Sequence, residues 1–285
     1  YDEAIKVYGQ YSLVDDFKSL WDLKTMNNTS ESIFEIQYNV EYMSRLIVYW
    51  TASKVTVSGN NWARFKPNIE VYDRHATTYP DDPRLNLTFV TEFDQWNKGV
   101  LKTVKTYPDY TKRGSKDKSY PYGYKYFAKD NNMTSTDTDL NYVIYRYADL
   151  LLMLAEIENE LNGPGNAYQY VNEVLARARV SGGLSSEMPA DMGGLTQEDF
   201  RQKIMAEYMF ELLGEGHDWF NVRRRGFTYF KENVIDAHNN HPDYKFSNKW
   251  DVEYVTNEKI MVLPIPNTEI SSNLKLDATD QNPGY

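Results

Sequence analysis

Two amphipathic helices joined by a short break, between residues 142 and 180, are the feature that most narrows the folds open to this chain. In the first helix, apolar residues recur at every third or fourth position, which is the spacing of one helix face: Val143, Tyr147, Leu150, Leu151, Leu154, Ile157 and Leu161. Asn162-Gly-Pro-Gly165 interrupts the pattern, and four apolar residues then repeat it: Ala167, Val171, Val174 and Ala178. The spacing therefore predicts a helical hairpin over residues 142–180.

Small residues in this hairpin indicate how its helices pack. Ala155 faces the partner helix and Ala167 opens the second helix, and small residues at such positions let the helices of a tetratricopeptide repeat approach closely. The hairpin resembles one such repeat. We expect another helix after Thr196, which is placed as an N-cap with Asp199 three residues later, and a short helix over 217–225.

Other stretches favour strands or loops. From Phe34 to Val40 the even positions are apolar and most odd positions are polar, which is typical of a half-buried strand. The apolar run 259–266 ends in prolines, which suits an edge strand or an extended segment. Residues 51–140 and 226–258 show no sustained helical period, so we expect loops there. The predicted fold class is mostly α, with long irregular loops and a few short strands.

The composition excludes several classes of function. The chain has 41 acidic and 31 basic residues, a net charge of −10, which disfavours nucleic-acid binding. It has no cysteine, so disulfides, cysteine–zinc sites and cysteine nucleophiles are excluded. No apolar run approaches the ~18 residues of a membrane-spanning helix. Aromatic residues make up 15% of the chain and include 24 tyrosines, which argues against a disordered chain.

Aromatic residues of the stretch 51–140 are the candidates for ligand binding. Four of them are spread along it: Trp62, Trp96, Tyr107 and Tyr110. Four more alternate with other residues: Tyr120, Tyr122, Tyr124 and Tyr126. If the latter segment is extended, its rings project from one face, and flat rings can stack on the apolar faces of sugars. The rings can also serve as core or interface residues. Both interpretations stay open, and packing is the favoured one for the tyrosine run.

Two polar clusters invite a chemical interpretation. Glu207, Glu211 and Glu215 lie one helical turn apart; a glycosidase uses two carboxylates, but carboxylates on one helix face more often pair with arginines. His238, His241 and Asp243 form a possible metal-binding set, and a solvated polar loop is the simpler interpretation. The chain has no phosphate-binding loop and no zinc-protease or serine-hydrolase motif. We predict no catalytic residue, no metal and no cofactor.

Three ordered motifs resemble those of the SusD/RagB family. Residues 141–156, NYVIYRYADLLLMLAE, resemble its first signature. The residues that match signature positions are Arg146, Tyr147, Asp149 and Glu156. Residues 207–224, EYMFELLGEGHDWFNVRR, resemble the second signature. The residues that match it are Glu207, Glu211, Glu215, Gly216, Trp219 and Arg223. The ending LPIP at 263–266 and QNPGY at 281–285 resembles the third. Weaker similarities occur at 30–36 and 82–84.

The second motif also departs from the family pattern. Tyr208 and Asp218 stand where the family usually has arginine, and Asn221 where it often has aspartate. We interpret the motif positions as a salt-bridged brace behind the helices, so these residues are expected to be structural. The motifs do not contain the ligand site, and the aromatic candidates rest on the residues alone.

The resemblance implies a non-catalytic lipoprotein exposed on the outer membrane of Bacteroidetes-type bacteria. Such proteins sit over a SusC-like, TonB-dependent transporter and hand it oligosaccharides or, in some members, peptides. The implied fold has tetratricopeptide-like helical pairs that support a loop-rich ligand-binding part. Two alternatives stay open: a protein-interaction scaffold built on the helices and, less favoured, a glycoside hydrolase that uses Glu211 or Glu215.

The resemblance covers nearly the whole chain and corresponds to the C-terminal portion of a usual member. We expect a single SusD/RagB-type domain over 1–285. Within it, 1–50 is the end of a helical repeat region plus a short strand, 51–140 the putative ligand-binding region, 141–225 the helical signature region, and 226–285 a loop and tail. The upstream half is expected to be absent, and with it the lipid anchor that is the only expected membrane attachment.

Overall fold

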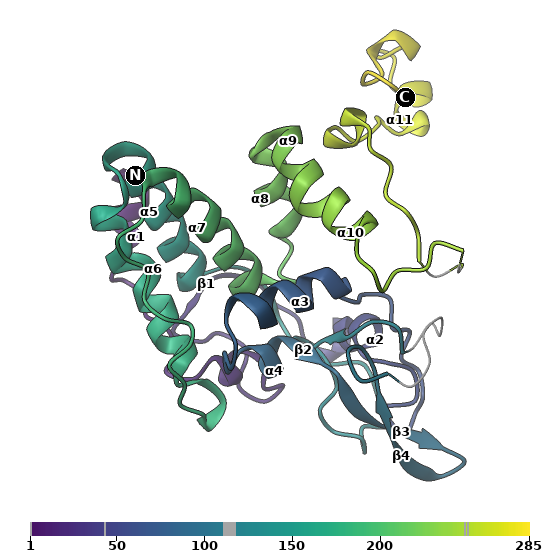
Figure 1. Ribbon diagram of the computed structural model, residues 1–285. Coiled ribbons are helices and arrows are strands. Elements are labelled where there is room, and N and C mark those ends of the chain that lie inside the picture. The colour runs from purple at the N-terminus through teal and green to yellow at the C-terminus, as the bar shows by residue number, and fades with distance from the viewer. Residues whose placement is uncertain (1, 43, 111–117, 248, 250) are drawn as a thin grey trace. The chain divides into compact units, whose positions relative to one another are not determined.

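The chain forms two compact units, Tyr1–Asp218 and Trp219–Tyr285, in a computed structural model that describes residues 2–42, 44–110, 118–247, 249 and 251–285 (Figure 1). The first unit contains the predicted hairpin and the loop-rich stretch. Within the described ranges, every helix is too short or too polar to cross a lipid bilayer.

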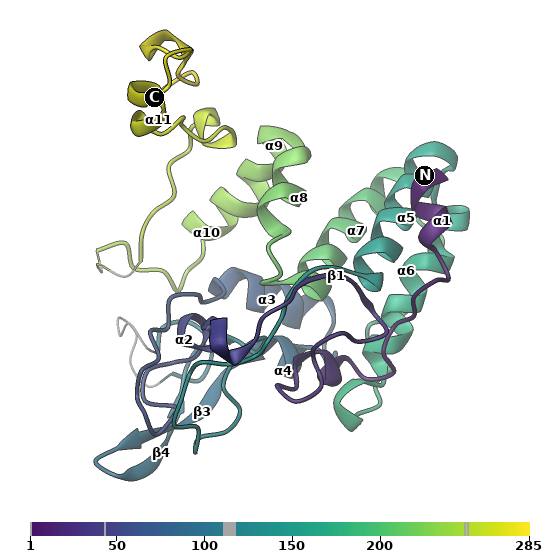
Figure 2. The same cartoon turned by 180° about the vertical axis from the view of Figure 1, so that it is seen from behind.

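The helical hairpin consists of α5 (Tyr147–Asn162) and α6 (Pro164–Arg179), with only Gly163 between them. Gly163 has a φ of +82°, a conformation that glycine adopts without strain, and Pro164 takes the first helical position, where a missing N–H costs nothing. Helix α7 (Gln197–Leu212) packs beside α5, as both views show (Figure 1, Figure 2). Thr196 caps α7 by accepting a 3.1 Å hydrogen bond from the backbone N–H of Asp199. The predicted hairpin and cap are confirmed.

The predicted start of the hairpin is wrong by five residues. Residues Tyr142–Arg146 form strand β6, which pairs antiparallel with β1 (Ser32–Ile36). The backbone N–H of Tyr147 then donates to the carbonyl of Glu31 at 2.7 Å. The spacing of apolar residues could not reveal this boundary. A segment of five residues is short enough to fit a strand or the first turn of a helix, and Val143 is at a position that continues the apolar face of the helix.

Strand β1 has the predicted alternation with the faces reversed. Glu35 is buried, and it accepts hydrogen bonds from the Asn28 backbone N–H at 3.1 Å and from Asn141 Nδ2 at 2.7 Å. Phe34 and Ile36 are instead 57% and 42% exposed. The expectation that the apolar face of this strand is the buried one is therefore wrong, because donors from two other segments hold the carboxylate inside.

Residues 51–140, expected to be loops, contain short regular elements. They are α3 (Ile69–Thr78), α4 (Leu85–Thr88), β2 (Phe89–Val90), β3 (Glu92–Asn97), β4 (Val100–Lys105) and β5 (Tyr122–Gly123); residues 111–117 lie outside the described part of the chain. Strands β3 and β4 form a hairpin that extends away from helices α5–α7 in both views (Figure 1, Figure 2). Most of these elements are shorter than the window over which a period can be recognised.

The remaining helices of the first unit are α1 (Asp2–Val7), α2 (Leu46–Trp50) and 3₁₀ segments at Phe17–Trp21, Val40–Tyr42 and Ser181–Gly183. Helix α8 (Asp218–Arg224) begins at the last residue of the first unit. The second unit also has α9 (Gly226–Phe230), a π-helical stretch Lys231–Asp236, α10 (Ala237–Asn239), α11 (Asn267–Ser272) and 3₁₀ segments at Glu258–Met261 and Ala278–Asp280. The helix predicted over 217–225 is confirmed. The loop expected from residue 226 is wrong up to 239. Of the two alternatives for residues 259–266, the edge strand is wrong: the segment begins in a 3₁₀ turn that ends at Met261, and Val262 after it has extended backbone.

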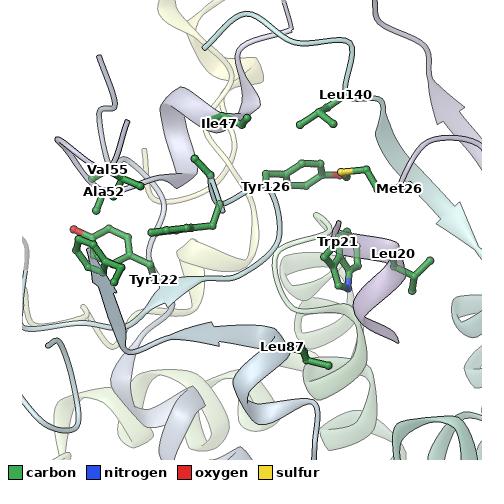
Figure 3. Close-up of a cluster of buried hydrophobic side chains, with 14 of the residues drawn as sticks. Leu20, Trp21, Met26, Ile47, Ala52, Val55, Leu87, Tyr122, Tyr126 and Leu140 are labelled. Carbon is green, nitrogen blue, oxygen red and sulfur yellow. The ribbon is translucent and has the colours of Figure 1, made fainter. Parts of the chain in front are cut away.

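An aromatic core holds the loop-rich part together. Tyr126 lies beside Met26, between Trp21 and Leu140, and Tyr122 lies near Val55 and Ala52 (Figure 3). Trp50 packs between two backbones that leave no room for side chains: a Cβ on Gly123 would lie 2.8 Å from its ring, and one on Gly214 would lie 2.6 Å from it. The aromatic content of the chain is therefore used largely to fix irregular segments.

A buried ionic network lies next to this core. Its members come from segments far apart in the sequence: Glu31, Asp82, Arg84, Lys125, Arg146, Arg177, Glu207, Glu211 and Glu215. Glu211 is its centre, because its carboxylate accepts from Arg84 at 2.9 Å, from Arg146 at 2.7 Å and from Arg177. Arg146 also pairs with Glu31 at 2.5 Å and with Glu215 at 2.7 Å. One guanidinium thus joins β6 to the segment before β1 and to the end of α7.

The network sets the ionisation of its carboxylates. Burial by itself raises the pKa of a carboxyl group. At Glu211 this effect is exceeded by the attraction of Arg177, Arg146 and Arg84, so its pKa is held well below the ordinary value. At Asp82, Arg84 and the hydrogen bond from His75 likewise outweigh burial and bring the pKa to about 2. Glu207 shows the opposite balance, since burial keeps its pKa raised despite Arg84.

We predict that Glu211→Gln destabilises the protein by about 3–5 kcal/mol at pH 7, because it leaves three arginines without their shared carboxylate. A carboxyl group with a depressed folded-state pKa contributes stability above its unfolded pKa, near 4.3, and loses it as the pH falls further. The difference between the wild type and Glu211→Gln should therefore shrink between pH 4.5 and pH 3, as measured by urea unfolding.

The matched control is Glu198→Gln, an exposed carboxylate in the first turn of the same helix. It should cost less than about 1 kcal/mol. A Glu211→Gln loss that is small at pH 7, or that does not change on acidification, would contradict the assignment of Glu211 as the centre of the network.

A second prediction concerns Trp50. Gly214→Ala should destabilise the protein by about 1–3 kcal/mol more than Gly163→Ala. Both glycines have positive φ, +78° and +82°, but the space around Gly163 is open while the Gly214 Cβ would meet Trp50. The difference between the two unfolding free energies isolates the steric contact from backbone strain; equal losses would show that Trp50 is not confined there.

Candidate functional site

Exposure separates the eight aromatic candidates into two groups. Trp62 is 49% exposed, whereas Tyr122 and Tyr126 are completely buried and Tyr107 is almost so. The other four, Trp96, Tyr110, Tyr120 and Tyr124, are partly buried. A ring can stack on a sugar only if one of its faces reaches solvent, so Trp62 is the strongest of the eight.

The tyrosine run is not extended, so it does not present four rings on one face. Only Tyr122 and Gly123 are in a strand, and Tyr126 has a φ of +57°, so the segment turns instead of extending. Tyr122 and Tyr126 point into the aromatic core (Figure 3). Tyr124 is covered in part by Lys129, whose Nζ lies 4.2 Å from the ring centroid. The run is mainly a packing device.

Trp96 and Tyr107 hold neighbouring segments in place. Trp96 Nε1 donates to the carbonyl of Asn131 at 2.8 Å, which joins β3 to the loop before β6. The Tyr107 hydroxyl donates to the carboxylate of Asp73 on α3 at 2.6 Å, and Tyr110 stacks on Tyr107 at 5.7 Å between centroids. Through these contacts, Trp96, Tyr107 and Tyr110 hold segments of the loop-rich part together.

Two rings that sequence reasoning missed lie beside Trp62. Tyr49 is 36% exposed and Phe65 is 51% exposed. Tyr49 meets Trp62 edge to face at 5.6 Å and meets Phe65 at 6.2 Å between centroids. We call these three side chains, Tyr49, Trp62 and Phe65, the Trp62 patch. Tyr49 could have been suspected because it stands next to Trp50 in a short apolar run.

Backbone hydrogen bonds fix the Trp62 patch in one place. The N–H of Trp62 donates to the Val48 carbonyl at 2.7 Å, and the N–H groups of Arg64 and Phe65 donate to the Tyr49 carbonyl at 2.7 and 3.2 Å. Segment 62–65 is thereby pinned along α2. Ala63, between Trp62 and Arg64, is buried with a φ of +51°. The chain therefore turns at Ala63, and the side chains on both sides of it are exposed.

The inner side of this segment is equally well held. Trp50 follows Tyr49 and packs against Phe65 at 5.3 Å and Tyr126 at 6.0 Å between centroids. Trp50 is in turn confined by Gly123 and Gly214. The patch is therefore a preorganised apolar surface, and flat rings in a fixed arrangement bind the apolar face of a sugar without an ordering cost.

The histidine cluster of the second unit has a packing role. His238 is buried, stacks on Tyr254 at 3.9 Å between centroids, and forms a 2.9 Å hydrogen bond to the Val252 carbonyl through Nε2. Among the residues that the structure describes, no three His, Asp or Glu side chains are grouped so as to hold a metal ion.

The signature residues lie mostly in or near the ionic network. Arg146, Glu207, Glu211 and Glu215 belong to it, and three further residues are buried on α5: Tyr147, Asp149 and Glu156. Gly216 follows with a φ of +91°. Trp219 and Arg223 are in the second unit, where Trp219 packs on Phe230 at 5.6 Å and Arg223 Nε donates to the Met261 carbonyl. Arg84 and Glu31, from the two weaker similarities, are part of the network too.

The comparisons with known proteins agree on one family. A model of the SusD family matches residues 12–285. SusD-like protein P2 of Formosa agariphila is 27% identical over 286 residues, which cover 96% of this chain and 52% of the relative.

Solved structures share the fold. A SusD homologue from Bacteroides thetaiotaomicron matches with a TM-score of 0.73 at 24% identity, over 99% of this chain and 58% of that one. Surface glycan-binding protein A from the same organism, in complex with laminarihexaose, matches with a TM-score of 0.62 at 22% identity, over 95% of this chain and 56% of that one. The chain thus spans about half the length of these relatives. With a family model that matches nearly all of its residues, the chain belongs to the SusD family.

Proposed function

We propose that this chain belongs to a non-catalytic cell-surface protein that captures an oligosaccharide and delivers it to a SusC-like, TonB-dependent transporter of the outer membrane. The observation that carries the capture step is the Trp62 patch. Its three exposed rings are fixed by backbone hydrogen bonds above the partly buried Trp50, which packs on the buried Tyr126, and an exposed apolar surface of this kind marks a binding site.

Two relatives of known ligand support carbohydrate as the ligand class. Surface glycan-binding protein A of Bacteroides thetaiotaomicron was solved with laminarihexaose, and another protein of the same fold is a laminarin-binding SusD-like protein. Both are glycan-binding proteins with the fold of this chain, which covers 56% and 54% of their lengths. A peptide ligand, which some members of the family are expected to take, remains the alternative outcome of a binding test.

The placement of the carboxylates supports the non-catalytic part of the proposal. Glu211 and Glu215, the residues that a glycoside hydrolase would use, are fully buried and paired with arginine. A general acid or nucleophile must reach the glycosidic bond, and these two side chains are held away from solvent. Delivery to the transporter, the outer-membrane location and the lipid anchor rest on family membership alone.

We predict that Trp62→Ala weakens oligosaccharide binding by about tenfold or more, because a stacking ring at the centre of a site is the type of residue that dominates binding energy. Isothermal titration of the chain against a panel that includes laminari-oligosaccharides measures the effect. Phe34→Ala is the control, since it removes an equally exposed ring from β1. Equal affinity for Trp62→Ala and the wild type would sink the Trp62 patch as the site.

A stability measurement separates the patch from the core. Tyr122→Ala should cost about 3–5 kcal/mol of unfolding free energy, as expected for a buried aromatic residue, whereas Trp62→Ala should cost less than about 1 kcal/mol. Comparison of the two urea midpoints shows whether a loss of binding in Trp62→Ala reflects a lost contact or a damaged fold. A large loss of stability in Trp62→Ala would reassign that ring to packing.

A further inference from the structure

We propose that the Trp62 patch prefers glycans that carry negative charge, as carboxylate or sulfate groups, and that Arg64 is the residue that recognises the charge. This inference rests on the proposed function, because it names the substrate class of the same surface.

The position of Arg64 is the first observation. Its guanidinium carbon lies 5.7 Å from the centroid of the Trp62 ring. That distance is within the ~6 Å of a cation–π contact, so the guanidinium lies over part of the ring. Trp62 still keeps 49% of its surface exposed. A sugar on the ring would have the cation beside it.

Arg64 also lacks the acidic partner that other arginines of the first unit have. Arg45, nineteen residues earlier, pairs with Asp137 at 3.0 Å, and Arg84, Arg146 and Arg177 pair inside the network. In the part of the chain that the structure describes, Arg64 is exposed and no carboxylate lies within ion-pairing distance of it. Its donors are therefore available to a ligand.

The charge of the sequence segment that builds the patch is the second observation. From Tyr42 to Ile69 the chain has four basic residues, Arg45, Lys54, Arg64 and Lys66, and no aspartate or glutamate. Over the whole chain, in contrast, 41 acidic residues outnumber 31 basic ones. The segment that builds the patch is thus a basic stretch of sequence in an acidic protein, although Arg45 in it is paired with Asp137.

The chemistry of guanidinium fits this class of ligand. Its planar, permanently charged fork donates two parallel hydrogen bonds to a carboxylate or to the oxygens of a sulfate. A uronic acid or a sulfated pyranose has an apolar ring face next to its charged group. Such a sugar can stack on Trp62 and pair with Arg64 at the same time, whereas a neutral sugar can use only the ring and ordinary hydrogen bonds.

The test compares matched glycans on the intact chain by titration calorimetry. One pair is a galacturonic-acid oligosaccharide and its methyl ester, and the other is a sulfated galactan oligosaccharide and its desulfated form. We expect the charged member of at least one pair to bind about tenfold more tightly, because hydrogen bonds to charged groups are the stronger ones. The preference should decrease as salt is raised, since screening weakens exposed charge pairs.

Three variants identify the residue. Arg64→Gln should remove the preference for the charged member and leave the affinity for the neutral one within about twofold, and Arg64→Lys should retain part of the preference. Lys54→Gln is the control, because it removes an exposed cation from the same basic stretch. Far-ultraviolet circular dichroism confirms that the variants are folded.

The outcomes distinguish this inference from the proposed function. Equal affinity for charged and neutral glycans, or a preference that survives in Arg64→Gln, overturns the role of Arg64 while a loss in Trp62→Ala still supports the Trp62 patch. If Lys54→Gln removes the preference as completely as Arg64→Gln does, the specific role of Arg64 is also overturned, because general attraction by positive charge then explains the preference. If neither a charged nor a neutral glycan binds, the proposed function itself fails.

Discussion

The buried ionic network around Glu211 is the interaction on which the rest of the first unit depends. Its charges come from the segment before β1, from the loop before α4, from the tyrosine run, from β6, and from helices α6 and α7. A buried charge that loses its partners costs several kcal/mol, so each of these segments is held in one position by the others.

This constraint explains how long irregular segments can carry a rigid surface. Lys125 lies in the tyrosine run between the buried Tyr122 and Tyr126 and pairs with Glu215 inside the network. The network thus holds the run on one side, and the aromatic core holds it on the other. Trp50 then packs against Tyr126, Gly123 and Gly214. Through Trp50 the position of α2, and with it the Trp62 patch, is linked to the end of α7. Buried rings and buried charges together replace the regular hydrogen-bond ladders that these loops lack.

Much of the helical scaffold followed from the sequence, and the site followed only in part. The spacing of apolar residues located α5, α6 and α7, since a helix face produces a period that survives in any context. Trp62 was among the candidates because a large ring in a loop can stack on the apolar face of a sugar. Tyr49 and Phe65 were missed, since their relation to Trp62 depends on a turn at Ala63 and on hydrogen bonds to Val48 and Tyr49. For the tyrosine run, packing was the favoured interpretation, but the regular spacing did not reveal that the chain turns at Tyr126.

By itself the sequence determined helices α5 to α8, the cap at Thr196, the family and the presence of a charged brace behind the helices, since these depend on local periodicity or on residues within one motif. Only the tertiary structure decided which aromatic rings are buried and which face solvent. It also decided that Glu35 points inward while Phe34 and Ile36 point outward. The physical reason is the same in both cases: burial is a property of the partners that surround a side chain, and those partners can be 106 residues away in the sequence, as Asn141 is from Glu35.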